Sequence, residues 1–423
     1  MIKVTFCAYD KPDNVGGPVS WIRRLFPLLR SRGIEPRCLF LMHWGENGPA
    51  LDALRDAGFD CRWTTLDRTE DRIQWILEDL SENPPDVFVP NLVVAAYYAA
   101  RWAHAAGIPT VGILHSDDPF YRALQSEFVF GDAEYRLDAI VPVSRKLEEE
   151  IASLDPRNTI VRRIPYGVTI PEVVARRAPS GLRLAYVGRL VEEQKRISEV
   201  VRALGNAVKT VPGTTAVIYG DGPDRRRVEK LLESELAGTD IVLTGLVDSE
   251  QMQKRMLDAD VIVLLSDYEG LPIALIEAMA CGCVPVCLRG SSGIPELVVH
   301  EVTGLLVDDR SAGFVSAIRS LSDDPALWSR LSAAAHERAL EFSAESSADA
   351  WAALFAELHE GRTRSVPVKV PASFALPPVH PGLASADRRL LRSRWLSDII
   401  SRSRMLLGKW KRALLTRTAQ SHT

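Results

Sequence analysis

The chain has 423 residues, of which 46% are hydrophobic and 25% are charged, a composition typical of a soluble globular protein of two or three domains. No apolar run approaches the roughly 18 to 20 residues that span a bilayer, and we expect the first ten residues, MIKVTFCAYD, to form a strand rather than a signal peptide. Six cysteines in so long a chain do not indicate a disulfide framework, so we expect a cytoplasmic location.

The net charge of −4 is distributed unevenly along the chain. Residues 361–423 contain thirteen Lys and Arg against two Asp, which gives +11, so residues 1–360 carry −15. An acidic body with a basic tail argues against nucleic-acid binding through the folded part.

Strand and helix patterns alternate through the first half of the chain. Apolar runs typical of strands lie at residues 2–8, 37–43, 86–90, 110–114 and 138–144, and a helix is expected over residues 21–32. This alternation predicts an α/β fold with a parallel sheet covered by helices on both faces. Gly16 and Gly17 follow the first strand, at the sheet edge where ligands bind, and a glycine pair lets the backbone approach a ligand closely. Their pattern is not G-x-G-x-x-G, which argues against a dinucleotide oxidoreductase.

Polar residues follow two later strands of this half. His115 ends the strand over residues 110–114, where a single histidine is either a polar loop residue or a site residue. Asp117 and Asp118 resemble a metal-binding D-x-D only loosely, and we interpret them as loop carboxylates that could line an acceptor rim. Ser144 is expected to cap the helix that follows it.

Residues 164–180 concentrate Pro and Gly between two strand-rich halves and are the expected domain junction. In the second half, Gly188 and Arg189 follow a strand, and Lys195 lies near the start of a helix. Two cations at a helix N-terminus can bind a diphosphate, although a solvated basic pair is the simpler interpretation of these two residues alone. Gly220 and Gly245 each follow a further strand.

The stretch over residues 266–285, SDYEGLPIALIEAMACGCVP, is where the chemistry is expected. Glu269 should lie in a strand-to-helix loop and Glu277 near the second turn of the following helix, whose N-terminus suits a phosphate. Carboxylates would repel phosphate, so we expect each of them to face neutral hydroxyls, which a nucleotide sugar offers on its ribose and on its hexose. The alternative interpretation is that Glu277 is only a carboxylate on the helix surface and Glu269 only a charged loop residue.

Cys281, Cys283 and Cys287 follow in the same region. They lack a paired C-x-x-C and extend from a helix end into a strand, so packed thiols are favoured over a metal cluster.

Several motifs of the second half resemble one known family. EGLPIALIEAMACG, GIPELV (residues 293–298) and TGLLV (residues 303–307), together with GRL and its lysine at residues 188–195, resemble the retaining glycosyltransferases of family 4. The resemblance is strong over residues 183–307 and looser before them. It implies a GT-B fold, in which two Rossmann-like doubly wound domains face each other across a cleft.

The resemblance also implies roles for individual residues. Arg189 and Lys195 would bind the diphosphate, while Glu269 and His115 would contact the donor sugar, and these four are the expected catalytic residues. The expected substrate-binding residues are Gly16, Gly17, Gly220, Gly245, Val247, Gly270, Leu271, Pro272, Ile273 and Glu277, of which Glu277 would hold the ribose. No metal and no cofactor are implied. The chain departs from the family at Tyr166 and Thr169, where Asn and Asp are usual, which puts a polar role there in doubt.

The expected function is transfer of a hexose-type sugar from a nucleotide-diphosphate sugar to an acceptor hydroxyl with retention of configuration, in polysaccharide or glycolipid assembly. The acceptor would be a glycan or a lipid-linked glycan. A catalytically silent nucleotide-sugar-binding protein of the same fold is the alternative from another class, and a GT-B epimerase or phosphorylase is a second enzyme alternative.

We expect four regions along the chain. The resemblance implies an acceptor-side domain over residues 1–170, a nucleotide-sugar-binding domain over residues 181–345 and a helix over residues 346–360 that crosses back to the first domain. It does not explain residues 361–423, which we expect to form a Pro-rich linker with a basic tail. Residues 386–415 mix basic residues with Leu, Ile and two Trp, which predicts peripheral docking on an anionic membrane at the inner face. A disordered basic tail, or one folded against the acidic body, is equally compatible with this composition.

Overall fold

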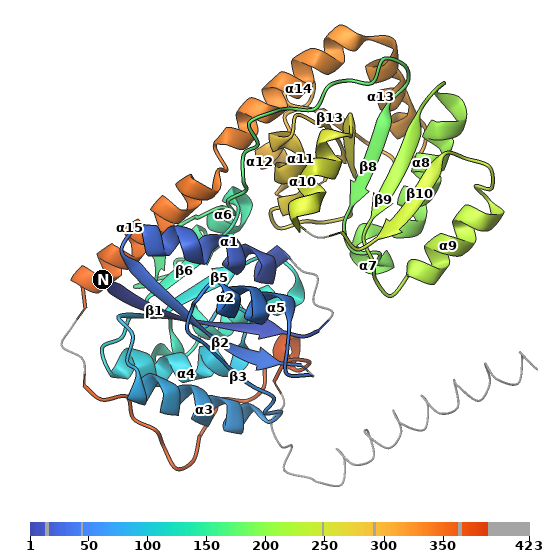
Figure 1. Cartoon of the computed structure of the whole chain (residues 1–423). Coiled ribbons are helices and arrows are strands. Elements are labelled where there is room, and N and C mark those ends of the chain that lie inside the picture. The colour runs from blue at the N-terminus through green and yellow to red at the C-terminus, as the bar shows by residue number, and fades with distance from the viewer. Residues whose placement is uncertain (13–16, 44, 248, 291–292, 363–365, 388–423) are drawn as a thin grey trace, which may run out of the picture.

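The computed structural model describes residues 1–12, 17–43, 45–247, 249–290, 293–362 and 366–387. The described chain forms two lobes, each with a parallel sheet, and helix α15 (Ala344–Glu360) leads from the second lobe back along the first (Figure 1). None of the described helices is long and apolar enough to cross a membrane.

The first lobe contains strands β1 to β7, all paired in parallel. Their bounds are β1 Ile2–Asp10, β2 Ile34–Met42, β3 Cys61–Thr64, β4 Val87–Val89, β5 Val111–Leu114, β6 Ala139–Pro142 and β7 Ile160–Val161. The strand order is β3-β2-β1-β4 and then β5-β6-β7, and a parallel bridge between Phe88 and Thr110 joins the two groups. The order therefore reverses between β1 and β4, which is where a doubly wound sheet forms its ligand crevice.

Helices cover both faces of this sheet (Figure 1). They are α1 Gly17–Ser31, α2 Pro49–Asp56, α3 Thr69–Glu82, α4 Val94–Ala105, α5 Pro119–Phe128 and α6 Arg145–Ala152. The strands are buried on both faces, as their continuous apolar runs predict. Gly17 opens α1, four residues before the expected start, whereas Gly16 lies outside the described residues.

The second lobe repeats this topology with the strand order β10-β9-β8-β11-β12-β13. Its strands are β8 Arg183–Val187, β9 Thr215–Tyr219, β10 Ile241–Gly245, β11 Val261–Leu264, β12 Val284–Leu288 and β13 Leu305–Val307. Its helices are α7 Glu192–Lys195, α8 Ile197–Thr210, α9 Arg225–Ser234, α10 Ser249–Leu257, α11 Ile273–Ala280, α12 Ile294–Leu297, α13 Ala312–Asp323 and α14 Pro325–Leu340. Here the strand order reverses between β8 and β11, so the loops after these two strands line the expected crevice.

The chain crosses between the lobes twice, and the two crossings lie side by side. Val168, in the first crossing, pairs with Ser343, which is the N-cap of α15 in the second. Helix α15 then packs on α1, with Trp351 next to Trp21 and Phe355 next to Phe6. Both aromatic side chains of α15 are buried, so the second crossing contributes to the core of the first lobe.

Residues 366–387 form a C-terminal strap across the first lobe. Val368 and Leu383 are buried, and the Phe374 ring packs edge-on against Trp102 of α4. At its end, the Asp387 carboxylate accepts hydrogen bonds from the Thr69 hydroxyl at 2.8 Å and the Tyr98 hydroxyl at 3.2 Å. The segment contains no described strand and includes a short 3-10 turn at Pro381–Leu383, and it is packed against the protein rather than running free as the expected linker would.

Candidate active site

The loops after β8 and β11 bring three expected site residues together. Glu269, in the loop after β11, is buried, and one of its carboxylate oxygens lies 2.5 Å from the Lys195 ammonium. The Gln194 amide donates to the other oxygen at 3.4 Å, and its own oxygen accepts from the Arg189 guanidinium at 3.2 Å. Lys195 therefore pairs with Glu269 directly, and Arg189 is linked to Glu269 through Gln194, a residue that the motifs did not single out.

The helix at Lys195 differs from the expected one. The residues 192–195 form the single turn α7, and Arg196 then has a left-handed backbone with φ of 50° before α8 begins. The Glu192 carboxylate accepts from both the backbone N–H and the hydroxyl of Ser198, so it caps α8. The N-terminus of α8 is thus occupied by a carboxylate, and Lys195 lies before that helix rather than within its first turn.

Among the described residues, no carboxylate caps the N-terminus of α11 in this way. Its N-cap residue is Pro272, which makes no side-chain cap hydrogen bond, and the buried residues Gly270 to Pro272 lead into it from Glu269. Ile273 is the first residue of the helix and Glu277 lies in its second turn, as expected. A helix N-terminus next to Lys195 and Arg189 is suited to bind a phosphate group.

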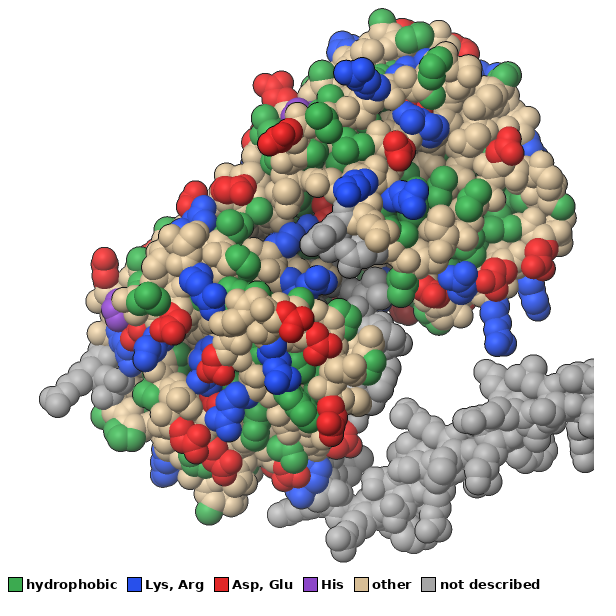
Figure 2. Space-filling model, in the orientation of Figure 1, with side chains coloured by type: hydrophobic (Ala, Val, Ile, Leu, Met, Phe, Trp, Pro, Cys, Tyr) green, Lys and Arg blue, Asp and Glu red, His purple; other side chains and the backbone are tan. Residues whose placement is uncertain are grey.

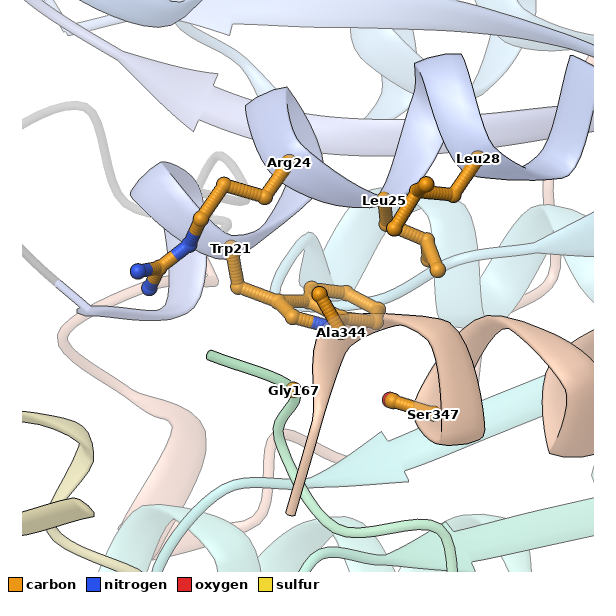
Figure 3. Close-up of a pocket in the computed structure, with 7 residues that line it drawn as sticks. All are labelled: Trp21, Arg24, Leu25, Leu28, Gly167, Ala344 and Ser347. Atoms are coloured by element: carbon orange, nitrogen blue, oxygen red, sulfur yellow. The ribbon is translucent and has the colours of Figure 1, made fainter. Parts of the chain in front are cut away.

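Glu277 pairs across the lobes. Its carboxylate forms an ion pair with the Arg24 guanidinium of α1, and each of the two side chains is 26% exposed. In Figure 3 Arg24 extends away from Leu25 and Leu28, which with Trp21 face Ala344 and Ser347 in a small pocket. Figure 2 shows the two lobes meeting at a waist, with Lys and Arg side chains on both sides of it. Arg24 is a second functional candidate that the sequence motifs did not indicate.

A second approach between the lobes occurs at Gly270. A Cβ at this position would lie 2.0 Å from the carbonyl oxygen of His115 and 3.1 Å from the Cα of Ser116. The loop of Glu269 therefore meets the backbone at the end of β5, where the sequence predicted a site residue.

The His115 side chain is buried among aromatic rings and has both nitrogens occupied. Nε2 is hydrogen bonded to the Asn91 side-chain oxygen at 2.7 Å, and Nδ1 is hydrogen bonded to the Tyr166 hydroxyl. Burial lowers the pKa of His115 to about 3 and raises that of Tyr166, so both side chains are neutral at ordinary pH. The departure from the family at Tyr166 had put a polar role there in doubt, but the Tyr166 hydroxyl has a polar partner in His115.

The remaining expected residues have mainly structural contacts. A Cβ on Gly220 would lie 1.9 Å from the Gly188 carbonyl oxygen, and the Gly220 N–H donates to the Gly245 carbonyl at 2.8 Å. Val247 follows β10 and is half-buried. These glycines hold the turn that carries Arg189.

The polar residues after β5 and β6 also have local partners. Asp118 is the N-cap of α5 and accepts from the backbone N–H groups of Phe120 and Tyr121 at 3.0 and 3.2 Å. Asp117 is paired with Lys146. Ser144 caps α6 as expected, and its hydroxyl accepts from the Leu147 N–H.

The cysteines of the second lobe, Cys281, Cys283 and Cys287, are buried free thiols, and the Cys283 thiol lies 3.1 Å from the carbonyl of Met256. Burial raises the pKa of all three. Among the described residues, no group of three or more His, Cys, Asp and Glu is arranged to hold a metal ion.

Known proteins resemble the chain in sequence. Residues 176–338 match the family described as glycosyl transferases group 1. A glycogen synthase from Mycobacterium tuberculosis is 28% identical over 316 residues, which cover 69% of this chain and 74% of that protein. A GDP-mannose-dependent alpha-(1-6)-phosphatidylinositol dimannoside mannosyltransferase of the same species is 26% identical over 273 residues, 60% of this chain and 68% of that protein.

Solved structures resemble the whole two-lobed body. HepE from Anabaena, solved in complex with UDP and glucose, superposes with a TM-score of 0.68 at 16% identity and covers 84% of this chain and 100% of its own. A sucrose-phosphate synthase from Thermosynechococcus elongatus gives a TM-score of 0.67 at 20% identity, covering 85% and 100%. The expected fold class is thereby confirmed: the chain has the GT-B fold and carries a glycosyl transferases group 1 domain in its second half.

Proposed function

We propose that this protein is a retaining glycosyltransferase that moves a hexose-type sugar from a nucleotide-diphosphate sugar to an acceptor hydroxyl in polysaccharide or glycolipid assembly. The observation that carries the proposal is the linked set of Arg189, Gln194, Lys195 and Glu269 at the reversal point of the second sheet, beside the open N-terminus of α11. Relatives that act in glycogen and mannoside synthesis support it.

In the proposed site, positive groups bind the diphosphate and carboxylates bind hydroxyls. Lys195, Arg189 and the first N–H groups of α11 stabilise the charge that grows on the leaving diphosphate, an effect worth about 3 to 4 kcal/mol for a strong donor. Glu269 accepts hydrogen bonds from the donor sugar, and Glu277 accepts them from the ribose hydroxyls.

The proposed transfer needs no protein nucleophile and no metal. The bond between the anomeric carbon and the diphosphate oxygen breaks, and the acceptor hydroxyl attacks from the same face. Attack on this face retains the configuration. The departing phosphate oxygen takes the acceptor proton, and the products are a glycoside and a nucleoside diphosphate.

The alternative is a catalytically silent nucleotide-sugar sensor. Loss of Arg189, Lys195, Glu269 or Glu277 would favour it, but the chain has all four residues. A thermal-shift panel of nucleotide sugars identifies the donor in either case, because ligand at about 100 times its dissociation constant adds roughly 2.7 kcal/mol to stability. Sugar release from the responding donor, with and without acceptors and with and without EDTA, then separates an enzyme from a sensor.

The decisive variant is Lys195→Ala. We expect turnover to fall by about 100-fold or more because the leaving diphosphate loses a preorganised cation. Lys209→Ala is the matched control, since this lysine is exposed on α8 and its ammonium donates to the Glu235 carbonyl rather than to Glu269. A folded Lys195→Ala protein that turns over like the control would refute the assignment.

A further inference from the structure

Three buried side chains form a hydrogen-bonded chain at the reversal point of the first sheet. Asn91 follows β4 and is fully buried, His115 follows β5, and Tyr166 lies in the first crossing between the lobes. A neutral imidazole has one donor and one acceptor. With the Asn91 oxygen toward the ring, Nε2–H donates to Asn91 and Nδ1 accepts from the Tyr166 hydroxyl, so a single tautomer is fixed.

Asn91 is held in this position at a cost to stability. Its φ of 47° lies in the left-handed region, which non-glycine residues seldom adopt. Its side-chain nitrogen is buried and makes no hydrogen bond to any described atom. Strain and an unpaired polar atom at a ligand-binding edge of the sheet are typical of a functional position rather than of core packing.

The chain of contacts leads from Asn91 toward both the cleft and the crossing. The His115 ring is parallel to that of Tyr166, at 5.7 Å between centroids and 7° between planes, with Trp21 and Tyr121 packed edge-on. The His115 carbonyl meets Gly270, next to Glu269 of the second lobe. Fixing the ring therefore also fixes the peptide against which the Glu269 loop closes.

We propose that Asn91 is a positioning residue for the transfer reaction, which acts through His115 by fixing its tautomer and the place of its peptide against the Gly270 loop. The inference rests on the proposed function and adds to it a residue outside every motif. It assigns Asn91 an effect on turnover in the closed complex rather than on donor binding, because the hydrogen bond that the Asn91 side chain makes among the described residues is to His115, in the first lobe.

Two variants test the proposal. Asn91→Leu removes the acceptor, so we expect kcat to fall about 10-fold with the donor KM changed less than about 2-fold, as for a small misplacement of reacting groups. Asn91→Asp keeps an acceptor for Nε2–H and adds a negative charge that favours the imidazolium. Above the resulting His115 pKa, Asn91→Asp should recover most of the lost kcat.

The pH profile supplies a readout that a purely structural role would not change. Burial keeps the pKa of His115 at about 3, and the titratable groups packed against its ring are Tyr121 and Tyr166, whose pKa values burial raises. Unaltered protein should therefore show no His115 ionisation between about pH 5 and 8. Asn91→Asp should gain one there, with activity lost on the acid side because a protonated Nδ1 cannot accept from Tyr166.

Asn83→Asp, the same change at an exposed position after α3, is the control and should keep the profile of the unaltered protein. Nitrogen-15 spectra of the histidine side chains report the His115 tautomer and its pKa without any assay of transfer. An active protein in which Asn91→Leu keeps full kcat, or in which Asn91→Asp gains no ionisation, overturns the inference. Failure of the unaltered protein to transfer sugar from any donor counts against the proposed function instead.

Discussion

Gly270 is a residue at which the backbones of the two lobes approach each other closely. A methyl group there would meet the His115 carbonyl oxygen at 2.0 Å, well inside van der Waals contact, and the obstacle is backbone rather than a flexible side chain. The glycine of the EGLP segment is thus required by the close approach of the lobes and not by a turn with positive φ.

Gly270→Ala should therefore keep the lobes from meeting at this point. We expect kcat/KM for the donor to fall by about 10-fold or more, because a site built from both lobes is no longer in register. Gly290→Ala is the matched control, since the one described atom near its Cβ would be the Asp267 carbonyl oxygen, at an ordinary 3.7 Å. Small-angle scattering on both variants would show whether closure is affected, and equal kcat/KM in the two would contradict this account of Gly270.

At the scale of elements, α1 connects three parts of the molecule. Its Trp21 and Leu25 pack toward α15, while Arg24 reaches α11 of the second lobe and pairs with Glu277. If Glu277 holds the ribose, Arg24 and the nucleotide compete for one carboxylate, because a vicinal diol needs both carboxylate oxygens.

Arg24→Ala should tighten the binding of a nucleoside diphosphate by up to about 5-fold, since a partly exposed ion pair contributes about 0.2 to 1 kcal/mol. Titration calorimetry with UDP and GDP measures this effect. Arg32→Ala removes an ion pair between Asp349 and the residue that directly follows α1, without reaching the second lobe, and it should leave the affinity unchanged. Weaker binding by Arg24→Ala would show instead that Arg24 contacts the nucleotide.

The elements also show what the sequence could and could not predict. Glu269, Glu277 and the open helix end between them lie within a dozen residues, so apolar runs and turn residues were sufficient to locate them. The break between α7 and α8 was missed because it depends on Glu192 capping Ser198 rather than on a glycine or a proline. A glutamate six residues before the residue that it caps is only a weak signal in the local sequence pattern.

Contacts between distant residues were beyond the sequence patterns. Arg24 and Glu277 are 253 positions apart, and Asn91 and His115 are 24 positions apart in the loops after two different strands, with no sequence pattern near them that would predict the pairing. The strap was predicted to be extended from its prolines, but its anchoring at Asp387 depends on Thr69 and Tyr98, far earlier in the chain. Such pairings follow from the folded topology alone.

At the scale of the whole molecule, the strap determines where the basic tail leaves the body. Asp387 is fixed at Thr69, the first residue of α3, and residues 381–383 lie on α5. Both helices begin at the carboxyl edge of the first sheet, which is the side of the cleft. Most of the predicted membrane segment, residues 388–415, lies outside the described residues.

We therefore propose that the tail docks on anionic lipid and holds the acceptor side of the cleft near the membrane. Residues 388–423 contain ten Lys and Arg against one Asp, and each basic residue near an anionic leaflet contributes about 1 kcal/mol. Full-length protein should sediment with anionic vesicles at modest salt, and protein ending at residue 387 should not. Neutral vesicles are the control, and equal sedimentation of the two proteins would remove the proposal.

The packing of α15 and the strap also has a consequence for biosynthesis. A ribosome makes the first lobe's strands and inner helices early, but Trp351, Phe355 and Asp387 emerge only after the entire second lobe. Until then Phe6 and Trp21 lack their cover, and apolar surface stays exposed on the nascent chain. The helices of the second lobe are all synthesised by Leu340, so its folding does not depend on α15 or the strap. The second lobe is therefore the lobe that can finish folding first, although its synthesis begins after that of the first lobe.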